Sequence, residues 1–300
     1  MGSRIPDFFI VGAPKCGTTA LYTYLRQHPE IFMPDVKELN FFCSDLGIPS
    51  LAADEHAYLS LFTGASGKKR AGEASVWYLY SPRAASAIRD FNVDSLIIIM
   101  LRDPVDMLYS LHSQRVYNGV ESIKNFEKAI NNRRPDNEGY RLLIDNGLPA
   151  GPFNLSVGKY SSHVRRYIST FGHERVKIIL YDDFKNDTTS VYRSVLDYLG
   201  VAPDFTPSFE IVNPNKQVRN VLLHRMVRTP STPVRALVRA LVPRPVRQRA
   251  AERIARANSK RTPRAPMPAD LRRRLTGELA SDIEDLGRLL RRDLTHWLSV

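Results

Sequence analysis

The sequence has few cysteines and no long hydrophobic run. Its two cysteines, Cys16 and Cys43, have neither a CxxC partner nor a set of histidines nearby, so we expect neither a disulfide framework nor a zinc site. The longest apolar stretch, 95–101, is far shorter than the roughly 20 residues that a membrane-spanning helix needs. The first residues also lack the pattern of a signal peptide. We therefore expect a globular protein of the cytoplasm.

Acidic residues are scarce in one part of the chain. The net charge is +12, and the tract 228–264 holds eleven Arg and Lys against the single acid Glu252. A localised basic segment favours contact with an anion, and a phosphorylated nucleotide, an acidic glycan, an anionic membrane and nucleic acid all qualify. The tract lacks the interleaved aromatics of single-strand binders, so we expect no nucleic-acid partner. The apolar stripe within 234–242 predicts a short amphipathic helix that packs on the core or lies on a membrane.

Apolar runs typical of buried strands alternate with segments of helical spacing. The sequence predicts strands at 7–12, 95–101 and 176–181, and helices at 19–26, 105–116, 160–171, 189–199 and 270–290. This alternation predicts an α/β fold in three layers, with a central, mainly parallel sheet and helices on both faces, similar to P-loop proteins. We expect one domain over 1–300, with a core of about 5–227 and a basic, proline-cut helical extension of about 228–300.

The loop GAPKCGTT, residues 12–19, connects the first predicted strand to a helix. In this position backbone N–H groups and the helix dipole bind phosphate. The loop has the glycines and the terminal Thr19 of a Walker A motif, but Thr18 stands where the lysine belongs, and a lysine occurs earlier, at Lys15. This change argues against a kinase or ATPase, which needs that lysine and Mg²⁺ on the β- and γ-phosphates. Lys15 can instead stabilise the charge that develops on a leaving-group oxygen, without a metal.

With this loop the chain resembles the PAPS-dependent sulfotransferases, in particular bacterial enzymes similar to the glycosaminoglycan sulfotransferase domains. The segment FIVGAPKCGTTAL, residues 9–21, is similar to the family's loop for the 5′-phosphosulfate. The resemblance implies that PAPS is the co-substrate, that PAP is its product and that no metal is required. It assigns the 5′-phosphosulfate to Lys15, Cys16, Gly17, Thr18 and Thr19.

The segment LRDPVDMLYS, residues 101–110, resembles the family's 3′-phosphate motif. The resemblance assigns Arg102 and Ser110 to that phosphate, and a planar guanidinium beside a hydroxyl suits such a group. Relatives commonly carry another arginine where Met107 stands. The basic loop NPNKQVRN, residues 213–220, resembles a family segment that folds over the donor phosphates, and this implies contacts from Lys216 and Arg219.

The segment PDVKELNFF, residues 34–42, resembles the part of the family that holds the general base. The resemblance makes Glu38 the group that takes the acceptor's proton, and Lys37 and Asn40 then lie beside the acceptor. Relatives carry histidine at the position of Asn40 and aspartate at that of Cys43. The surroundings of the base therefore differ from those in the relatives, and we expect a different acceptor.

The segment GEASVWYL, residues 72–79, resembles a family segment that lines the acceptor cleft. The resemblance makes Trp77 a residue of the acceptor site. Ala74 occupies a position where some relatives have a catalytic lysine, so that contribution is missing here. His112, two residues after Ser110, is an alternative base, although a histidine within a helix more often has a structural role.

The sequence thus predicts an enzyme that transfers a sulfuryl group in line from PAPS to a hydroxyl or amine of a glycan, glycolipid or small natural product. Two alternatives stay open. An atypical P-loop phosphotransferase would bind ATP with Mg²⁺. A non-catalytic module would dock on an anionic surface through 228–264 with steep salt dependence, and the same tract can serve the enzyme by holding an acidic glycan or a membrane-linked acceptor. The sequence predicts neither the acceptor's identity nor the oligomeric state.

Overall fold

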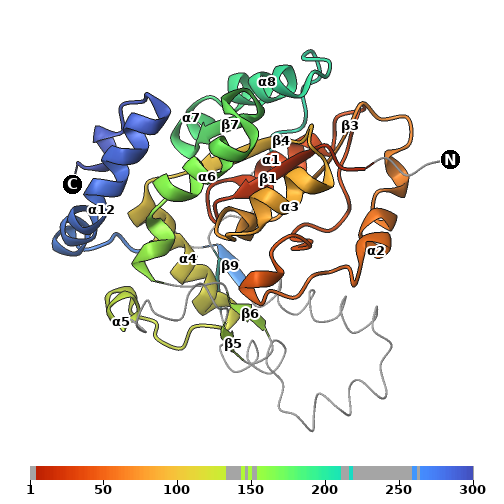
Figure 1. The fold of residues 1–300 in the computed structure, drawn as a ribbon. Coiled ribbons are helices and arrows are strands. Elements are labelled where there is room, and N and C mark those ends of the chain that lie inside the picture. Colours follow the sequence, from red (N-terminus) through yellow and green to blue (C-terminus); the bar gives the residue numbers. More distant parts are fainter. Residues whose placement is uncertain are drawn as a thin grey trace, which may run out of the picture.

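A five-stranded sheet forms the centre of the molecule, and each neighbouring pair of its strands is parallel (Figure 1). In spatial order the strands are β2 (Ile31–Phe32), β3 (Arg70–Ala74), β1 (Phe8–Gly12), β4 (Leu96–Leu101) and β7 (Val176–Leu180). The computed structural model describes residues 5–132, 143–145, 148–150, 154–210, 216–218, 259–261 and 264–299. The parallel sheet confirms the predicted α/β class.

The central strands are continuous apolar runs because helices cover both faces of the sheet (Figure 1). Residues 97–101 of β4 are fully buried. Helix α3 (Ala84–Phe91) packs against α6 (Ser161–Phe171). Helix α1 (Thr18–Leu25) reaches α7 (Tyr181–Asn186) through the rings of Tyr24 and Phe184, whose centroids lie 6.2 Å apart. These layers bury the sheet between them.

The predicted strands and helices of the core all occur within a few residues of their expected bounds. The further helices are α2 (Glu55–Ser60), α4 (Pro104–Asn118), α5 (Phe126–Asn131) and α8 (Thr188–Leu199). Two small antiparallel pairs join β5 (Leu143–Asp145) to β6 (Leu148–Ala150) and β8 (Lys216–Val218) to β9 (Ser259–Arg261). The amphipathic segment predicted within 234–242 lies outside the described residues.

Helix α12 (Ala269–Leu290) corresponds to the helix predicted at 270–290 and packs against α4 and α6. Its buried face consists mainly of Leu271, Leu275, Leu279, Ile283 and Leu286. The Asp282 carboxylate accepts hydrogen bonds from the backbone N–H groups of Tyr160 (2.6 Å) and Ser161 (3.3 Å), so it caps α6. Within the described ranges no helix is both long and apolar enough to cross a membrane.

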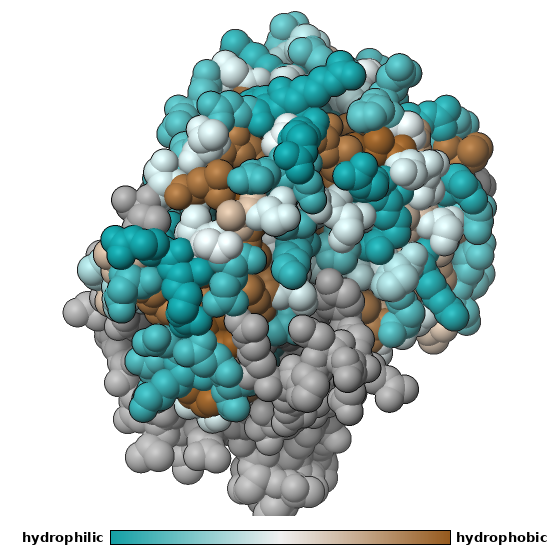
Figure 2. Space-filling model, turned by 60° about the vertical axis from the view of Figure 1, so that its left-hand side comes forward, coloured by the Kyte–Doolittle hydropathy of each residue, from teal (hydrophilic) through white to brown (hydrophobic). Residues whose placement is uncertain are grey.

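The side of the molecule that comes forward in Figure 2 is mainly hydrophilic, and apolar residues show only between polar ones. Large hydrophobic side chains with substantial exposure are few among the described residues, namely Ile5, Val36, Leu51 and Val93. Scattered exposure of this kind is normal for a globular protein. The described surface thus has no large apolar patch that would mark a binding site.

Candidate active site

The loop between β1 and α1 lies at the carboxyl end of the central strand, where parallel sheets bind ligands. Gly17 precedes α1 with φ of 89°, and a Cβ there would lie 3.2 Å from the Tyr181 ring and 3.3 Å from the Met100 methyl group. Only glycine combines a positive φ with the absence of a Cβ, so it fits this position without strain. The N-cap residue, Gly17, has no side chain that could cap the first turn of α1, and uncapped N–H groups at a helix N-terminus can bind an anion.

The side chains of this loop divide into buried and accessible ones. The Cys16 thiol is fully buried and donates to the Pro14 carbonyl at 3.3 Å, and burial raises the pKa of Cys16 to about 12. Thr18 is also buried. Thr19 is half-buried. Cys16 can therefore contribute only its backbone N–H to a phosphate, while Lys15 and Thr19 retain partly accessible side chains.

Three cations from distant parts of the chain interact electrostatically at this loop, namely Lys15, Arg102 and Arg264. Burial, followed by the charges of Arg264 and Arg102, lowers the pKa of Lys15 to about 8. Burial and the charge of Arg102 likewise lower the pKa of Arg264. Like charges in a partly buried site repel one another, so an anion bound among these cations would offset this repulsion.

Arg102 and Ser110 occupy the positions that the spacing of the motif predicted, at the end of β4 and on α4. The Arg102 guanidinium lies 4.8 Å from the Tyr181 ring centroid and pairs with the Asp106 carboxylate at 3.1 Å. Ser110 is buried, and its Oγ accepts a hydrogen bond from Arg264 Nη2 at 3.1 Å. Met107 is fully buried, so this position of the motif belongs to the core.

Arg264 is a site residue that sequence reasoning missed. Its Nε donates to Ser113 Oγ at 2.9 Å, and its guanidinium carbon lies 5.1 Å from the Tyr109 ring centroid. In the sequence, Arg264 is only the last basic residue of the tract 228–264. Nothing in that tract indicated its contact with α4. The side chain of Lys216 and the whole of Arg219, both predicted to bind the donor, lie outside the described residues.

The predicted base, Glu38, is held from several sides on the loop that follows β2. Its N–H donates to the Ala74 carbonyl at 2.9 Å, and its Oε2 accepts from the Val76 N–H at 3.0 Å. The other carboxylate oxygen forms an ion pair with Lys37. Lys37 also contributes to the lowered pKa of Lys15, so the structure brings the loop that bears the base within electrostatic range of the donor loop.

Left-handed backbone conformations gather at these same residues. The non-glycine residues with positive φ in the described chain are Lys15 (63°), Glu38 (66°), Asn40 (54°) and Arg291 (51°). Such a conformation costs on the order of 1 kcal/mol or more for a residue with a side chain. Arg291 ends α12. The other three are residues that the sequence assigned to the donor and acceptor sites, so strain of this kind coincides with the candidate site.

Comparison with known proteins identifies the family of this chain. Residues 5–227 match the sulfotransferase domain family. This chain is a member of that family. A solved relative, the sulfotransferase from Alicyclobacillus acidocaldarius, is 30% identical over 99% of this chain and 100% of its own, with a TM-score of 0.69.

Curated relatives share the family at lower identity. Human carbohydrate sulfotransferase 15 is 25% identical over 251 residues, which cover 66% of this chain and 44% of the relative. Mouse bifunctional heparan sulfate N-deacetylase/N-sulfotransferase 4 is 27% identical over 217 residues, which cover 68% of this chain and 23% of the relative. The chain thus spans less than half the length of these curated relatives.

Beneath the Glu38 loop, the sulfotransferase contains a buried carboxyl group that the sequence did not single out. Glu73 of β3 is almost fully buried, and its Oε2 accepts from the Tyr58 hydroxyl at 3.0 Å. Burial raises the pKa of Glu73 to about 7, although hydrogen bonds from Tyr78 and Tyr58 oppose the shift. Its Oε1 has no hydrogen-bond partner in the described part of the chain. A carboxyl group in such surroundings is half protonated near neutral pH.

Hydrogen bonds connect this buried region to the loop that bears Glu38. The Asn40 N–H donates to Ser75 Oγ at 3.1 Å, and the Phe41 N–H donates to the Tyr78 hydroxyl at 2.9 Å. The half-buried Trp77, predicted to contact the acceptor, stands between Ser75 and Tyr78 in the 3₁₀ segment Val76–Leu79. The position of the Glu38 loop therefore depends on the end of β3 and on this segment.

His112, the alternative base, is buried and lies with Nε2 2.8 Å from the Ile123 carbonyl oxygen. Burial lowers its pKa. This contact uses the proton of Nε2, so the geometry favours a structural role for His112. No group of three or more His, Cys, Asp or Glu side chains that could hold a metal ion occurs in the described ranges.

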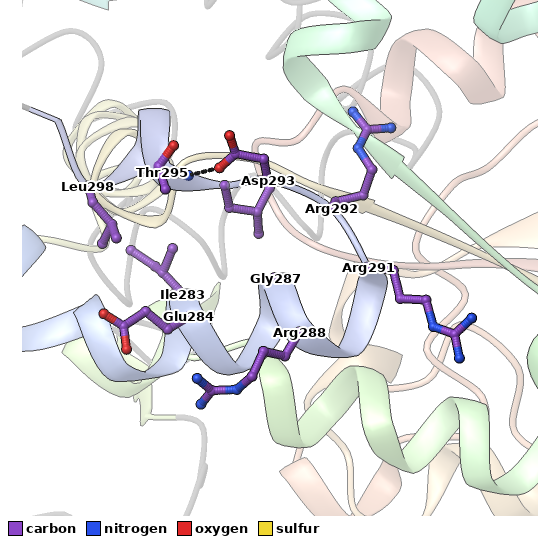
Figure 3. A pocket seen from close by; sticks show the side chains of 10 residues that line it. Ile283, Glu284, Gly287, Arg288, Arg291, Arg292, Asp293, Thr295 and Leu298 are labelled. Atoms are coloured by element: carbon purple, nitrogen blue, oxygen red, sulfur yellow. Dashed lines mark hydrogen bonds between the residues drawn. The ribbon is translucent and has the colours of Figure 1, made fainter.

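A surface hollow of about 430 Å³ lies at the other end of α12, away from these residues (Figure 3). It is lined by Ile283, Glu284, Gly287, Arg288, Arg291, Arg292, Asp293, Leu294, Thr295 and Leu298. The Arg288 guanidinium extends away from the segment that bears Thr295 and Leu298 (Figure 3). Arg288 and Arg292 are already paired with Asp285 and Asp183. None of the candidate site residues lines this hollow, so it is not part of the candidate active site.

Proposed function

We propose that this sulfotransferase takes its sulfuryl group from PAPS and transfers it to a hydroxyl or amine of an acceptor molecule. The observation that carries the proposal is the convergence of Lys15, Arg102 and Arg264, three mutually repelling cations, beside the N-terminus of α1. PAPS carries a phosphosulfate and a second, separate phosphate. The donor loop and the Arg102, Ser110 and Arg264 group offer one cationic subsite for each.

When PAPS is bound, the acceptor oxygen or nitrogen forms a bond to sulfur while the bond from sulfur to the phosphate oxygen breaks, and PAP leaves with that electron pair. Lys15 and the N–H groups of α1 stabilise the negative charge that grows on the phosphate oxygen. Arg102, Ser110 and Arg264 hold the 3′-phosphate and so fix the position of the donor. The resemblance to the family assigns Lys15, Arg102 and Ser110 to these phosphates, and their charge and hydrogen-bonding capacity suit the roles.

Glu38 is the proposed general base, which takes the acceptor's proton as the bond to sulfur forms. The Val76 N–H orients one of its carboxylate oxygens, and Lys37 holds the other. The acceptor must therefore compete with Lys37 for that oxygen. Asn40 and Trp77 are the further proposed acceptor contacts.

For the acceptor we propose a glycan, glycolipid or small natural product that bears a hydroxyl or amine. The names of the curated relatives, a carbohydrate sulfotransferase and a heparan sulfate N-sulfotransferase, support a saccharide within this range. Contact of the tract 228–264 with an acidic glycan or an anionic membrane stays a prediction, because most of the tract lies outside the described residues. A cytoplasmic location and independence from metal stay predictions as well.

The test is calorimetric binding of PAP, AMP and Mg-ATP to the wild-type protein and to Lys15→Ala. We expect PAP to bind much more tightly than AMP, and Lys15→Ala to weaken PAP binding by roughly tenfold or more. Lys185→Ala, which removes an exposed lysine at the end of α7, is the matched control. A preference for Mg-ATP would instead support a phosphotransferase, and the absence of nucleotide binding would support a docking module.

A further inference from the structure

We propose that Arg272 of α12 is a positioning residue for the donor's 3′-phosphate and that it acts through Asp106 on Arg102. The inference rests on the proposed function, because it assumes that Arg102 binds that phosphate. No motif of the sequence pointed to Arg272, which stands among consecutive arginines at the start of a helix far along the chain. Its role appears only when α12 packs against α4.

The Asp106 carboxylate is shared between two guanidinium groups. Its Oδ2 pairs with Arg102 Nη2 at 3.1 Å, and its Oδ1 forms an ion pair with Arg272 Nη2. Arg272 Nη1 also lies 3.3 Å from Oδ2 of Asp103, the residue that caps α4. Only 25% of the Arg272 side chain is exposed, so solvent screens these contacts less than it screens a surface pair. Arg272 therefore binds both carboxylates next to Arg102.

The negative charge of Asp106 explains why the proposed phosphate site needs Arg272. Burial acts to raise the pKa of Asp106, but the charges of Arg102 and Arg272 outweigh burial and keep its pKa below the usual value. Asp106 therefore stays ionised near the place where the phosphate would bind. Without Arg272, Arg102 alone would have to balance the negative charge of Asp106, and less of its own positive charge would be left to attract the phosphate. Arg272 neutralises Asp106 and leaves the remaining N–H groups of Arg102 for the ligand.

Arg272 of α12 supplies the second positive charge beside Asp106. The motif that follows β4 has Met107 after Asp106, and Met107 is fully buried in the core. Within the described residues, the second guanidinium that contacts Asp106 comes from Arg272. Leu271 and Leu275 are buried on the same helix and hold α12 in place. The arginine is thus presented on a rigid element, as a positioning role requires.

The test compares PAP with AMP, which lacks the 3′-phosphate, on Arg272→Gln and on a control variant. We expect Arg272→Gln to weaken PAP binding about tenfold to hundredfold and to leave AMP binding within about twofold. Arg274→Gln is the matched control, because Arg274 lies on the same helix but pairs with Glu127 and Glu278. It should leave both affinities unchanged. Arg272→Lys keeps the charge and should restore part of the loss.

A second measurement tests the route through Asp106. If Arg272 acts on Arg102 through this carboxylate, Arg272→Gln should cost much less PAP affinity in an Asp106→Asn background than in the wild type. Additive losses would overturn the route. Equal weakening of PAP and AMP by Arg272→Gln would show a merely structural role and overturn the inference. If the wild type itself does not prefer PAP to AMP, the donor assignment fails, which is a different result.

Discussion

Arg264 donates a hydrogen bond to Ser110 across 154 positions of the sequence, at 3.1 Å. Ser110 belongs to the motif that follows β4, whereas Arg264 lies just before α12. The C-terminal segment therefore completes a site that the first part of the chain begins. Because Arg272 of the same segment contacts Asp106, both C-terminal contacts reach the part of α4 that is assigned to the 3′-phosphate.

Replacing Arg264 by Gln should weaken PAP binding and raise the KM for PAPS about tenfold to hundredfold, with a smaller effect on kcat. The guanidinium contributes a charge and two hydrogen bonds to the α4 serines, but it lies on the donor side rather than beside Glu38. Calorimetry and initial rates at varied PAPS measure this. Arg273→Gln, an exposed arginine on α12, is the control. An unchanged KM for PAPS would contradict the placement of Arg264 in the donor site.

The sequence singled out Lys15, Arg102 and Ser110 because each belongs to a local motif that follows a predicted strand. It could not predict Arg264, whose contact depends on how α12 packs against α4. Local patterns say which residues share an element, but not which distant elements meet. The resemblance to the family supplied roles for the local motifs and none for the C-terminal segment.

The burial of β3 escaped prediction for another reason. Strand β3 has the sequence RAGEA, which shows neither an apolar run nor clear alternation. Its place in the sheet comes from pairing with β1 and β2, and that pairing buries Glu73. The central strands were predicted because their composition alone requires burial on both faces.

Replacing Glu38 by Gln should lower kcat about 10²- to 10⁴-fold and leave PAP affinity nearly unchanged. Gln keeps the size of the side chain and can still accept a hydrogen bond from the Val76 N–H, but it cannot take a proton. The rate of sulfuryl transfer to an acceptor molecule that the wild type sulfates gives kcat, and calorimetry measures PAP binding. Asp35→Asn, on the exposed start of the same loop, is the control. Full activity of the Gln variant would assign the base elsewhere.

Binding of PAP should depend on the protonation of Lys15. Because burial and the charges of Arg264 and Arg102 bring its pKa down to about 8 in the free protein, Lys15 loses its charge as the pH rises through that value. PAP affinity should therefore be highest below pH 8 and should fall above it, by up to about tenfold per pH unit. Calorimetry between pH 6 and about 9.5 measures the slope. Lys15→Met should bind weakly at every pH and lose the step near pH 8.

Replacing Gly17 by Ala should destabilise the fold by two separable effects. The positive φ costs about 1 kcal/mol for any residue with a Cβ, and the new methyl group would meet Tyr181, Met100 and Phe184 at 3.2–3.3 Å. Gly67 also has positive φ, but its Cβ would meet nothing within 4 Å. Gly67→Ala therefore measures the backbone effect alone. Denaturant unfolding should show a larger loss for Gly17→Ala, and equal losses would show that the loop has room.

Glu73 should make the protein less stable as the pH rises toward neutral. Burial raises its folded pKa from 4.5 to about 7, so between these values the unfolded chain releases a proton that the folded protein keeps. The stabilisation that Glu73 gives is therefore full below pH 4.5 and lost as the pH rises through about 7, on the order of 3 kcal/mol in all.

The measurement is the free energy of unfolding of wild type and Glu73→Gln across this pH range. The difference between the two proteins isolates Glu73 from the other carboxylates, and it should shift in favour of the Gln variant as the pH rises. Tyr58→Phe removes a hydrogen bond that holds the pKa of Glu73 down. It should therefore raise the pH at which the stabilisation from Glu73 is fully lost. A difference between wild type and Glu73→Gln that does not change with pH would mean that Glu73 titrates at its ordinary value, and that the buried network beneath Glu38 holds a charge rather than a proton.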